Sequence, residues 1–447
     1  MRLTPEALHH LDAPFIKLGI MDTDGVLRTK YLSRDKLQSA LASGSSLCNV
    51  TFAWDIQDTV YADQPLPDPG FADARLTIDA GSGRTLPWEA DTPLLLGDFS
   101  NDAGPAGTAC PRSLLRRTVA RAAKLGLRAE FGPEYEWFAY RETPASLTRK
   151  HYRHLTPLSP GMFGYSSLRT GQHAGFWQAL AEQLNQVGVP LEGFHTETGP
   201  GALEAALVHQ SPLEAADRAT VFKETVKQVS YRHGLLASFM AKPSAELPGC
   251  GGHLHQSVWG DDNVNLFHEP AGRYGMSVQG EQYLAGQLQL LPALMPLFAP
   301  FVNSYKRYVP GSWAAVRANW GIDNRTVALR YVSGTPSAAR LELRVPGADA
   351  NPYLVMAAAL TAGLYGIEQE LTLDLAPLQG SAYEQHIGAP LAKDLGAAAG
   401  AMEAEPLVRN LLGEEFTDQF LRSRRWEWQR YQRAVTDWER ERYFELA

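Results

Sequence analysis

The sequence has little cysteine: three residues, Cys48, Cys110 and Cys250, in a chain of 447. The number is odd, the positions are scattered, and no CxxC motif occurs. A disulfide framework is therefore not expected, and a cysteine-based zinc site is disfavoured. We expect the protein to work in a reducing compartment, the cytoplasm.

Long hydrophobic runs and an excess of positive charge are also missing. The most apolar stretch, 288–302, is interrupted by prolines and is too short to span a bilayer. The first fifteen residues carry acids and no long apolar segment, so they are not expected to be a signal peptide. With a net charge of −8, neither a nucleic acid nor a membrane surface is expected as the main partner.

What the sequence does have is length and a change of pattern along the chain. A chain of 447 residues with 45% hydrophobic residues is long enough for two or three well-filled cores. The first hundred residues read as short strands and turns, and a Pro-, Gly- and Asp-rich stretch follows at 99–113. Helices and strands alternate after it. We predict two domains, 1–105 and 106–447.

Three helices are predicted from their end signals: 111–126, 211–234 and 351–370. Each has a proline in or near its first turn, where the missing N–H costs nothing. Ser211 and Glu214 have the spacing of a capping box, in which each side chain satisfies a backbone N–H of the first turn.

Acids and histidines recur with a spacing of two in the second part of the chain. In a strand, residues two apart point to the same face, so each pair enters the same surroundings. Three segments show this spacing: GPEYEWF with Glu134 and Glu136, GGHLHQS with His253 and His255, and ARLELRV with Glu342 between Arg340 and Arg344. A fourth segment, HTETGPGALE, places Glu197 and Glu204 on either side of a Gly-Pro-Gly turn.

Taken singly, each segment also fits a structural role: an edge strand facing water, a core histidine, or a surface ladder of ion pairs. Taken together they do not, because five carboxylates among apolar residues would repel one another if buried. Divalent cations would relieve that repulsion. Carboxylate oxygens with one imidazole suit Mg²⁺ or Mn²⁺ better than zinc.

Arginines are concentrated in the same third of the chain. Arginines and divalent cations together are suited to bind a nucleotide triphosphate and a carboxylate substrate. The sequence has neither GxxxxGK[ST] nor a GxGxxG between a strand and a helix, so ATP would be held by another device. The arginines are Arg307, Arg325, Arg330, Arg340 and Arg344.

These motifs resemble those of the glutamine synthetase family, in the family's order and over nearly the whole chain. KPSAELPGCGGHLHQS (242–257) is similar to its ATP-region signature, NSYKRYVPG to its glutamate-region signature, and RLELRVPGADANPYL to its metal-and-arginine segment. The resemblance implies an α+β protein with a small β-grasp N-terminal domain. It also implies a catalytic domain with a curved antiparallel sheet flanked by helices, and a ring-shaped homo-oligomer, usually a dodecamer, with active sites between subunits.

The resemblance also implies residue roles, with ATP and Mg²⁺ or Mn²⁺ as cofactors. One metal site would be Glu136, Glu197 and Glu204, and the other Glu134, His253 and Glu342. The nucleotide phosphates would lie near His255, Ser257, Arg325, Arg330 and Arg340. The substrate glutamate would be held by Arg307, Arg344 and the backbone at Gly249. The γ-carboxylate would attack ATP to give γ-glutamyl phosphate, which an amine then converts to the amide.

The departures from the family pattern cluster where the amine would enter. Family members that use ammonia usually carry an acid after the Arg307 motif, and here Trp313 stands in its place. Tryptophan has only an N–H donor, so it cannot take a proton, but its ring can line a pocket for carbon. Asp55 keeps the acid that attends ammonium in the family, although the residues around it differ. Pro248 and Ala202 are further departures.

We therefore predict an ATP-dependent ligase that joins glutamate to an organic amine: a polyamine, ethanolamine, or a small alkyl or aryl amine. Asp55 and Asp58 would favour a diamine, because its distal ammonium needs a partner. Trp54 and Trp313 would favour an alkyl or aryl amine, and the sequence does not separate the two. The alternatives are a true glutamine synthetase that uses ammonia and a catalytically silent structural relative.

Overall fold

The computed structural model describes residues 2–61, 71–99, 105–260 and 262–447. The N-terminal part forms a five-stranded sheet in the order β2-β1-β5-β4-β3, in which β1 pairs parallel with β5 and the other pairs are antiparallel. Its elements are α1 (Pro5–Leu8), β1 (Phe15–Met21), β2 (Leu27–Ser33), α2 (Arg34–Ser43), β3 (Ser45–Cys48), β4 (Asp73–Leu86) and β5 (Thr92–Phe99). The β-grasp assignment of this part stays a prediction.

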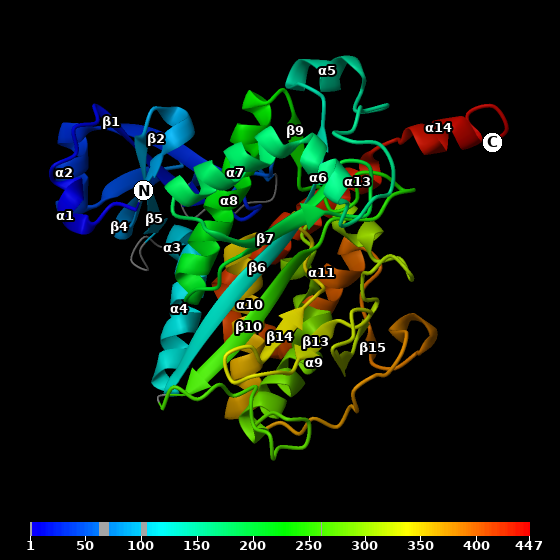
Figure 1. The fold of residues 1–447 in the computed structure, drawn as a ribbon. Coiled ribbons are helices and arrows are strands. Elements are labelled where there is room, and N and C mark those ends of the chain that lie inside the picture. The colour runs from blue at the N-terminus through cyan, green and yellow to red at the C-terminus, as the bar shows by residue number, and fades with distance from the viewer. Residues whose placement is uncertain (1, 62–70, 100–104, 261) are drawn as a thin grey trace.

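The second sheet is larger and curled, and it runs through the middle of the molecule (Figure 1). Its strand order is β12-β13-β14-β10-β6-β8-β7, and β9 also pairs with β6. All pairs are antiparallel except β12 with β13 at one edge. The strands are β6 (Leu127–Tyr140), β7 (Leu191–Thr196), β8 (Ala202–Leu207), β9 (Leu236–Ser238), β10 (Gly252–Gly260), β12 (Trp320–Ile322), β13 (Leu329–Val332) and β14 (Arg340–Leu343). β11 (Arg317–Ala318) and β15 (Ala389–Pro390) form a separate pair.

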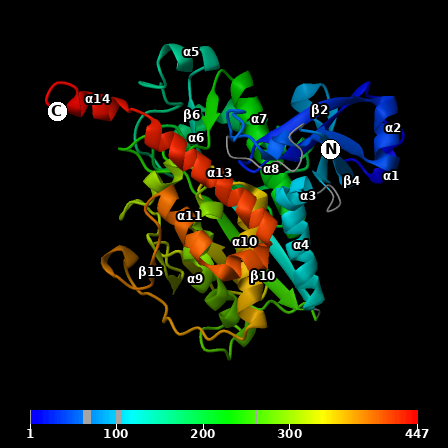
Figure 2. The same ribbon diagram turned by 180° about the vertical axis from the view of Figure 1, so that it is seen from behind.

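Helices cover one face of this sheet, and α9, α10 and α11 come to the front when the molecule is seen from behind (Figure 2). α10 is apolar all round and almost wholly buried, as expected of a central helix. A Cβ at Gly366 of α10 would lie 2.0 Å from the Gln282 carbonyl of α9, so the glycine permits this close contact. The longer helices are α4 (Pro111–Lys124), α7 (Ala174–Gln186), α8 (Pro212–Arg232), α9 (Val278–Phe298), α10 (Pro352–Glu368), α11 (Leu395–Ala404) and α13 (Glu414–Arg433). The shorter ones are α3 (Pro105–Ala109), α5 (Pro144–Arg149), α6 (Ser167–Gln172), α12 (Pro406–Leu412) and α14 (Asp437–Tyr443).

The three predicted helices are present as α4, α8 and α10. The capping box predicted at Ser211 and Glu214 is wrong. Ser211 makes no side-chain cap bond, and the Glu214 carboxylate accepts from Arg84 of β4 at 3.1 Å and from Arg218 at 2.8 Å. The predicted domain boundary adjoins residues 100–104, which lie outside the described part of the chain. The α+β class is confirmed.

A buried ion-pair network, the Arg112 network, joins the N-terminal sheet to the helices. The Arg112 guanidinium, at the start of α4, is 2% exposed and donates to Asp79 (2.7 Å), Asp98 (2.6 Å) and Asp217 (2.8 and 2.9 Å). Asp217 also accepts from the Tyr353 hydroxyl of α10. Since β4, β5, α4 and α8 meet at one guanidinium, this network fixes the N-terminal sheet against these two helices.

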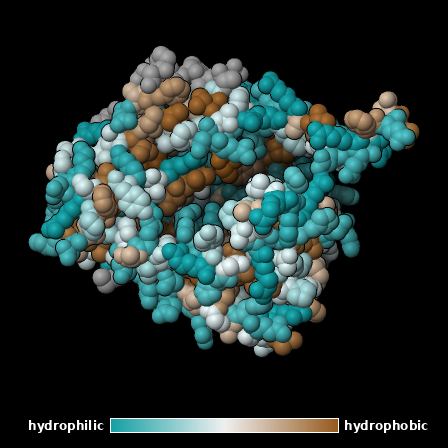
Figure 3. Space-filling view, turned by 90° about the horizontal axis from the view of Figure 1, so that it is seen from above, coloured by the Kyte–Doolittle hydropathy of each residue, from teal (hydrophilic) through white to brown (hydrophobic). Residues whose placement is uncertain are grey.

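The C-terminal arm, residues 435–447, projects from the body (Figures 1 and 3). It contains α14 and carries apolar side chains that are largely exposed: Val435, Trp438, Phe444 and Leu446. Asp437 pairs with Arg153, near the end of α5. Within the described residues, the longest apolar helices fall short of what a bilayer crossing requires.

Candidate functional site

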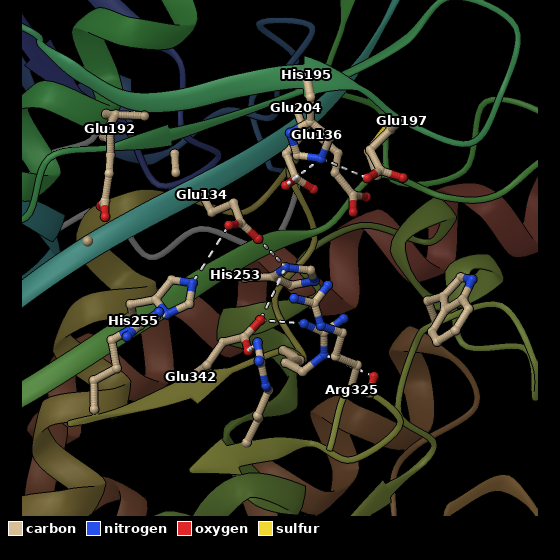
Figure 4. Close-up of a pocket in the computed structure, with 18 of the residues that line it drawn as sticks. Glu134, Glu136, Glu192, His195, Glu197, Glu204, His253, His255, Arg325 and Glu342 are labelled. Carbon is tan, nitrogen blue, oxygen red and sulfur yellow. Dashed lines mark hydrogen bonds and ion pairs between the residues drawn. The ribbon is translucent and has the colours of Figure 1, made fainter. Parts of the chain in front are cut away.

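A cavity of about 780 Å³ opens on the face of the large sheet away from α9 and α10. Its floor comes from β6, β8, β10 and β14, and loops from other parts of the chain form its walls. Four segments that are far apart in the sequence meet there (Figure 4). The predicted metal ligands all line it: Glu134, Glu136, Glu197, Glu204, His253 and Glu342.

Strand alternation accounts for the placement of these side chains. Glu134 and Glu136 of β6 face the cavity, whereas Tyr135 and Trp137 pack on Phe222 of α8 on the other face. The register then aligns the ligands across the sheet: His253 lies opposite Glu134, Glu204 opposite Glu136, and Glu342 opposite His255. Residues two apart on a strand thus face the same side of the sheet, and the strand register collects them into two groups of ligands on that side.

The first group, which we call the Glu134 cluster, contains Glu134, His253, His255 and Glu342. Nδ1 of His253 lies 2.9 Å from Glu134 and 3.7 Å from Glu342, and Nε2 of His255 lies 3.7 Å from Glu134. One ligand atom each from Glu134, His255 and Glu342 fall within 4.8 Å of one another, a separation that suits a shared cation. The structure thus places His255 beside Glu134 and Glu342 as well as the predicted ligand His253.

The second group, the Glu204 cluster, contains Glu136, His195, Glu197 and Glu204. Nε2 of His195 lies 3.1 Å from Glu197 and 3.4 Å from Glu204, and these three ligand atoms also fall within 4.8 Å of one another. Glu136 lies beside them, and its carboxylate accepts the backbone N–H of Gly251 (Figure 4). His195 was not among the predicted site residues.

Positively charged groups offset the negative charge of the Glu134 cluster more than that of the Glu204 cluster. Burial raises the pKa of Glu342, but Arg344 and the two histidines outweigh it and bring the pKa to about 2. Burial likewise raises the pKa of Glu134, and hydrogen bonds from His253 and His255 bring it well below the ordinary value. In the Glu204 cluster, burial and then the neighbouring carboxylates raise the pKa of Glu204 far above normal. A divalent cation would offset this repulsion between carboxylates, and the donor set of oxygens and imidazole fits one.

The predicted arginines line the same cavity on the β14 side. Arg330 pairs with Glu342 at 3.0 Å, and Nε of Arg340 donates to Nδ1 of His255 at 3.1 Å. Arg344 pairs with Glu342 and donates to the Arg325 carbonyl. Arg307 and Arg325 also line the cavity, and so does Ser257, which was predicted to lie near the nucleotide phosphates.

Arg307 and Gly249 lie close together, as their predicted shared role requires. The Arg307 side chain is buried and donates to the carbonyls of Val345 (2.9 Å) and Arg344 (3.3 Å). A Cβ at Gly249 would lie 2.5 Å from the Ala241 carbonyl and 2.8 Å from Cγ of Arg307. Only glycine fits at this position beside the cavity.

The residues expected near the amine are split between two places. Trp313 lines the cavity at its rim, with its side chain 58% exposed and its backbone at a φ of +61°. Asp55 is not brought to the cavity. Its carboxylate accepts from Trp426 (3.1 Å) and Arg430 (3.2 Å) of α13 and from the backbone of its own turn. Within one chain, Asp55 therefore accepts hydrogen bonds from its own turn and from α13.

Trp54 and Asp58 lie in that same N-terminal turn and both contact Arg28. The Arg28 guanidinium stacks on the Trp54 ring at 4.9 Å and pairs with Asp58 at 2.5 Å. Neither residue lines the cavity. A role of these residues at the amine would need a neighbouring subunit, which stays a prediction from the family resemblance.

A model of the glutamine synthetase catalytic domain matches residues 108–443. The chain belongs to the glutamine synthetase family. It is 43% identical to a type-1 glutamine synthetase 2 of Dictyostelium discoideum over 440 residues, which are 97% of this chain and 84% of that protein. Two further relatives of this ligase family are named for amine substrates. A glutamate–isopropylamine ligase of a Pseudomonas species is 34% identical over 98% of this chain and 96% of that protein. A γ-glutamylethanolamide synthetase of Streptomyces coelicolor is 35% identical over 98% and 95%.

Two solved structures share the whole fold. A complex of GmaS with ADP superposes with a TM-score of 0.86 at 28% identity and covers 99% of this chain and 100% of that one. A glutamine synthetase of Plasmodium falciparum, at 18% identity, has the same fold with a TM-score of 0.83, covering 99% of each chain. The predicted curved sheet with flanking helices is therefore confirmed.

Sequence reasoning missed His195 and Tyr165, both of which line the cavity. The signal for His195 was present: His195 lies in β7 and Glu197 directly follows that strand, so they have the spacing of two that singled out the other pairs. Tyr165 has no such signal. It lies in a loop, and only the fold stacks its ring on His195, with centroids 4.2 Å apart.

Proposed function

We propose that this glutamine synthetase-like ligase joins the γ-carboxylate of glutamate to an organic amine, with ATP as the energy source. The observation that carries the proposal is a combination within one cavity. The complete set of predicted metal and phosphate residues is gathered there, and Trp313 is at its rim where ammonia-using members carry an acid. The residues expected to phosphorylate the carboxylate are kept, and the residue expected beside the attacking amine is changed.

The charged groups suit a phosphoryl transfer. Bound Mg²⁺ or Mn²⁺ would neutralise the negative charge that spreads over the transferring phosphoryl group. We assign Glu136, Glu197 and Glu204 to one cation and Glu134, His253 and Glu342 to the other. The phosphates would be held by His255, Ser257, Arg325, Arg330 and Arg340, and the substrate glutamate by Arg307, Arg344 and the Gly249 backbone.

The reaction proceeds in two balanced steps. A γ-carboxylate oxygen attacks the γ-phosphorus of ATP, the bond from that phosphorus to the β-γ bridging oxygen breaks, and ADP leaves. The amine, as its free base, then attacks the acyl carbon of γ-glutamyl phosphate. The bond from that carbon to the phosphate oxygen breaks, and the surplus amine proton leaves with the phosphate. Arginines around both reacting groups stabilise the developing charge without rearranging.

Aromatic side chains at the rim favour an amine with a carbon skeleton. Trp313 and Tyr165 are 58% and 69% exposed, and both line the cavity. Both hold a positive φ, of 61° and 54°, which is uncommon for bulky residues and marks a fixed backbone position. The substrate names of two relatives, isopropylamine and ethanolamine, are of the same chemical kind.

An amine panel tests the proposal. ADP release and the mass of the product are measured with glutamate, ATP and either Mg²⁺ or Mn²⁺, using ammonium, alkylamines, ethanolamine, an arylamine and putrescine in turn. We expect at least one organic amine to give a kcat/KM more than tenfold above that of ammonium, and the product to be its γ-glutamyl amide. A preference for ammonium would instead establish a glutamine synthetase, the function named for the Dictyostelium relative.

A further inference from the structure

Three of the histidines that line the cavity lie at the two clusters, and the surroundings of their ring nitrogens differ. Each points one ring nitrogen at carboxylates: Nδ1 of His253 and Nε2 of His255 at Glu134, and Nε2 of His195 at Glu197 and Glu204. A histidine binds a metal through a nitrogen that carries a lone pair, not a proton. The question is therefore where each ring keeps its proton.

At His253 and His255, a neighbouring arginine determines which ring nitrogen carries the proton. Arg340 donates to Nδ1 of His255 at 3.1 Å, and Arg307 lies 3.5 Å from Nε2 of His253. A neutral ring that accepts on one nitrogen carries its proton on the other, and in both rings that is the nitrogen facing Glu134. A metal at either ring first has to displace the arginine contact.

His195 has no such constraint: among the described residues, no arginine nitrogen is bonded to its ring. With the proton on Nδ1, the Nε2 lone pair faces the Glu204 cluster. Face-to-face stacking with Tyr165, at 4.2 Å and an interplanar angle of 12°, fixes the ring plane that contains this lone pair. In strand register His195 also lies directly opposite Glu204.

We propose that His195 is a ligand, through Nε2, of the divalent cation at the Glu204 cluster, and that Tyr165 is a positioning residue for its ring. The inference rests on the proposed function, which requires a cation there, and adds a nitrogen donor to a site otherwise made of carboxylates. Imidazole favours Mn²⁺ over Mg²⁺, since affinity for nitrogen rises along the transition series and Mg²⁺ prefers oxygen. His195 thus sets the metal preference of this site.

Manganese binding to the full-length protein tests the inference without any substrate. Free Mn²⁺ is followed by its electron paramagnetic resonance signal during titration, and pulsed measurements on the bound ion detect directly coordinated ¹⁴N. For His195→Gln we expect Mn²⁺ affinity at one site to fall at least about tenfold, with a smaller loss for Mg²⁺. The ¹⁴N modulation per bound Mn²⁺ should fall as well.

Glutamine at position 195 can still donate a hydrogen bond to Glu197 and Glu204, so the variant separates ligation from orientation. Unchanged ¹⁴N modulation would overturn the inference, whether the affinity falls or not. Tyr165→Leu should keep the ¹⁴N modulation and weaken Mn²⁺ binding less than His195→Gln. His10→Gln, at an exposed position of the N-terminal part, is the matched control and should bind as the wild type does.

The outcome is distinguishable from a failure of the proposed function. If the wild-type protein binds no Mn²⁺, the proposed function fails together with the inference. If the wild type binds Mn²⁺ and His195→Gln binds it equally well, the function stands and the role of His195 is refuted. Should His195→Gln not fold, as judged by circular dichroism, His195→Asn is measured in the same way.

Discussion

Glu136 connects the metal chemistry to the backbone of the glycine loop. Its carboxylate accepts the Gly251 N–H and lies beside Glu197 and Glu204. Replacing it with alanine should remove a predicted metal ligand, and we expect turnover to fall at least about 100-fold. Because the side chain faces the cavity and not the core, the thermal unfolding midpoint should change little. ADP release and calorimetry measure the two effects, and normal turnover would refute the role.

Trp313 offers a test of how the nucleophile is chosen. Trp313→Glu restores the acid that ammonia-using family members carry at this position. We expect the ratio of kcat/KM for ammonium to that for the best organic amine to rise about tenfold, the scale of one altered pocket contact. Trp313→Phe, which keeps an aromatic ring, serves as the control. An unchanged ratio in the glutamate variant would remove Trp313 from the amine pocket.

Lys223 of α8 should make stability depend on pH. Burial and the nearby Lys227 lower its pKa to about 7, although Asp349 opposes the shift, and its Nζ donates to the Ala350 carbonyl at 3.0 Å. Between pH 7 and about 10.4 the unfolded chain keeps this proton and the folded chain has lost it. The free energy of unfolding therefore rises with pH across this window, by up to about 1.4 kcal/mol per pH unit.

Lys223→Met cannot titrate, so the difference in unfolding free energy between wild type and variant should change between pH 7 and pH 9. Urea unfolding at several pH values measures it. A difference that stays constant across these pH values would show that Lys223 is protonated in the folded protein.

At this scale the sequence revealed the residues whose role follows from strand alternation. Glu134, Glu136, His253 and Glu342 could be predicted because a spacing of two survives folding as a shared face. Asp55 shows the opposite case: its position in one chain depends on contacts with Trp426, about 370 residues away in the sequence, which no local pattern encodes.

The elements are held together by charge as well as by apolar packing. The Arg112 network brings β4, β5, α4 and α8 to one buried guanidinium. Arg112→Leu would leave Asp217 buried without its counter-charge, and removing one partner of such a pair costs about 3–5 kcal/mol. We expect a loss of that size in urea unfolding. Arg116→Leu, whose side chain is half exposed, should cost far less, and equal losses would contradict this account.

The helices also show where local signals fail. Their positions followed from proline at the start and apolar periodicity, and α4, α8 and α10 lie where they were predicted. The cap of α8 did not follow, because Glu214 is used by Arg84, 130 positions earlier in the sequence. A tertiary ion pair with a buried arginine outweighs a local bond to an exposed helix end.

For the whole molecule, we expect the C-terminal arm to take part in assembly. Exposed tryptophan, phenylalanine and leucine side chains on a projecting segment are stable when another surface covers them. We expect light scattering to give a mass near twelve times the 49.1 kDa chain, as the family resemblance predicts. Deleting 435–447 should lower that mass and leave the unfolding midpoint of the body almost unchanged. An unchanged mass would exclude the arm from the assembly.

The β6 strand also sets how far apart the two clusters lie. Glu134 and Glu136 belong to different clusters, and residues two apart on an antiparallel strand are separated by about 6.8 Å. A single bridging hydroxide spans only about 3.5–4 Å between two metals. A group long enough to contact both clusters would be a polyphosphate, which is the expected cofactor's reacting part. Side-chain substitutions can change the affinity of either cluster, and they leave the strand positions of Glu134 and Glu136 as they are.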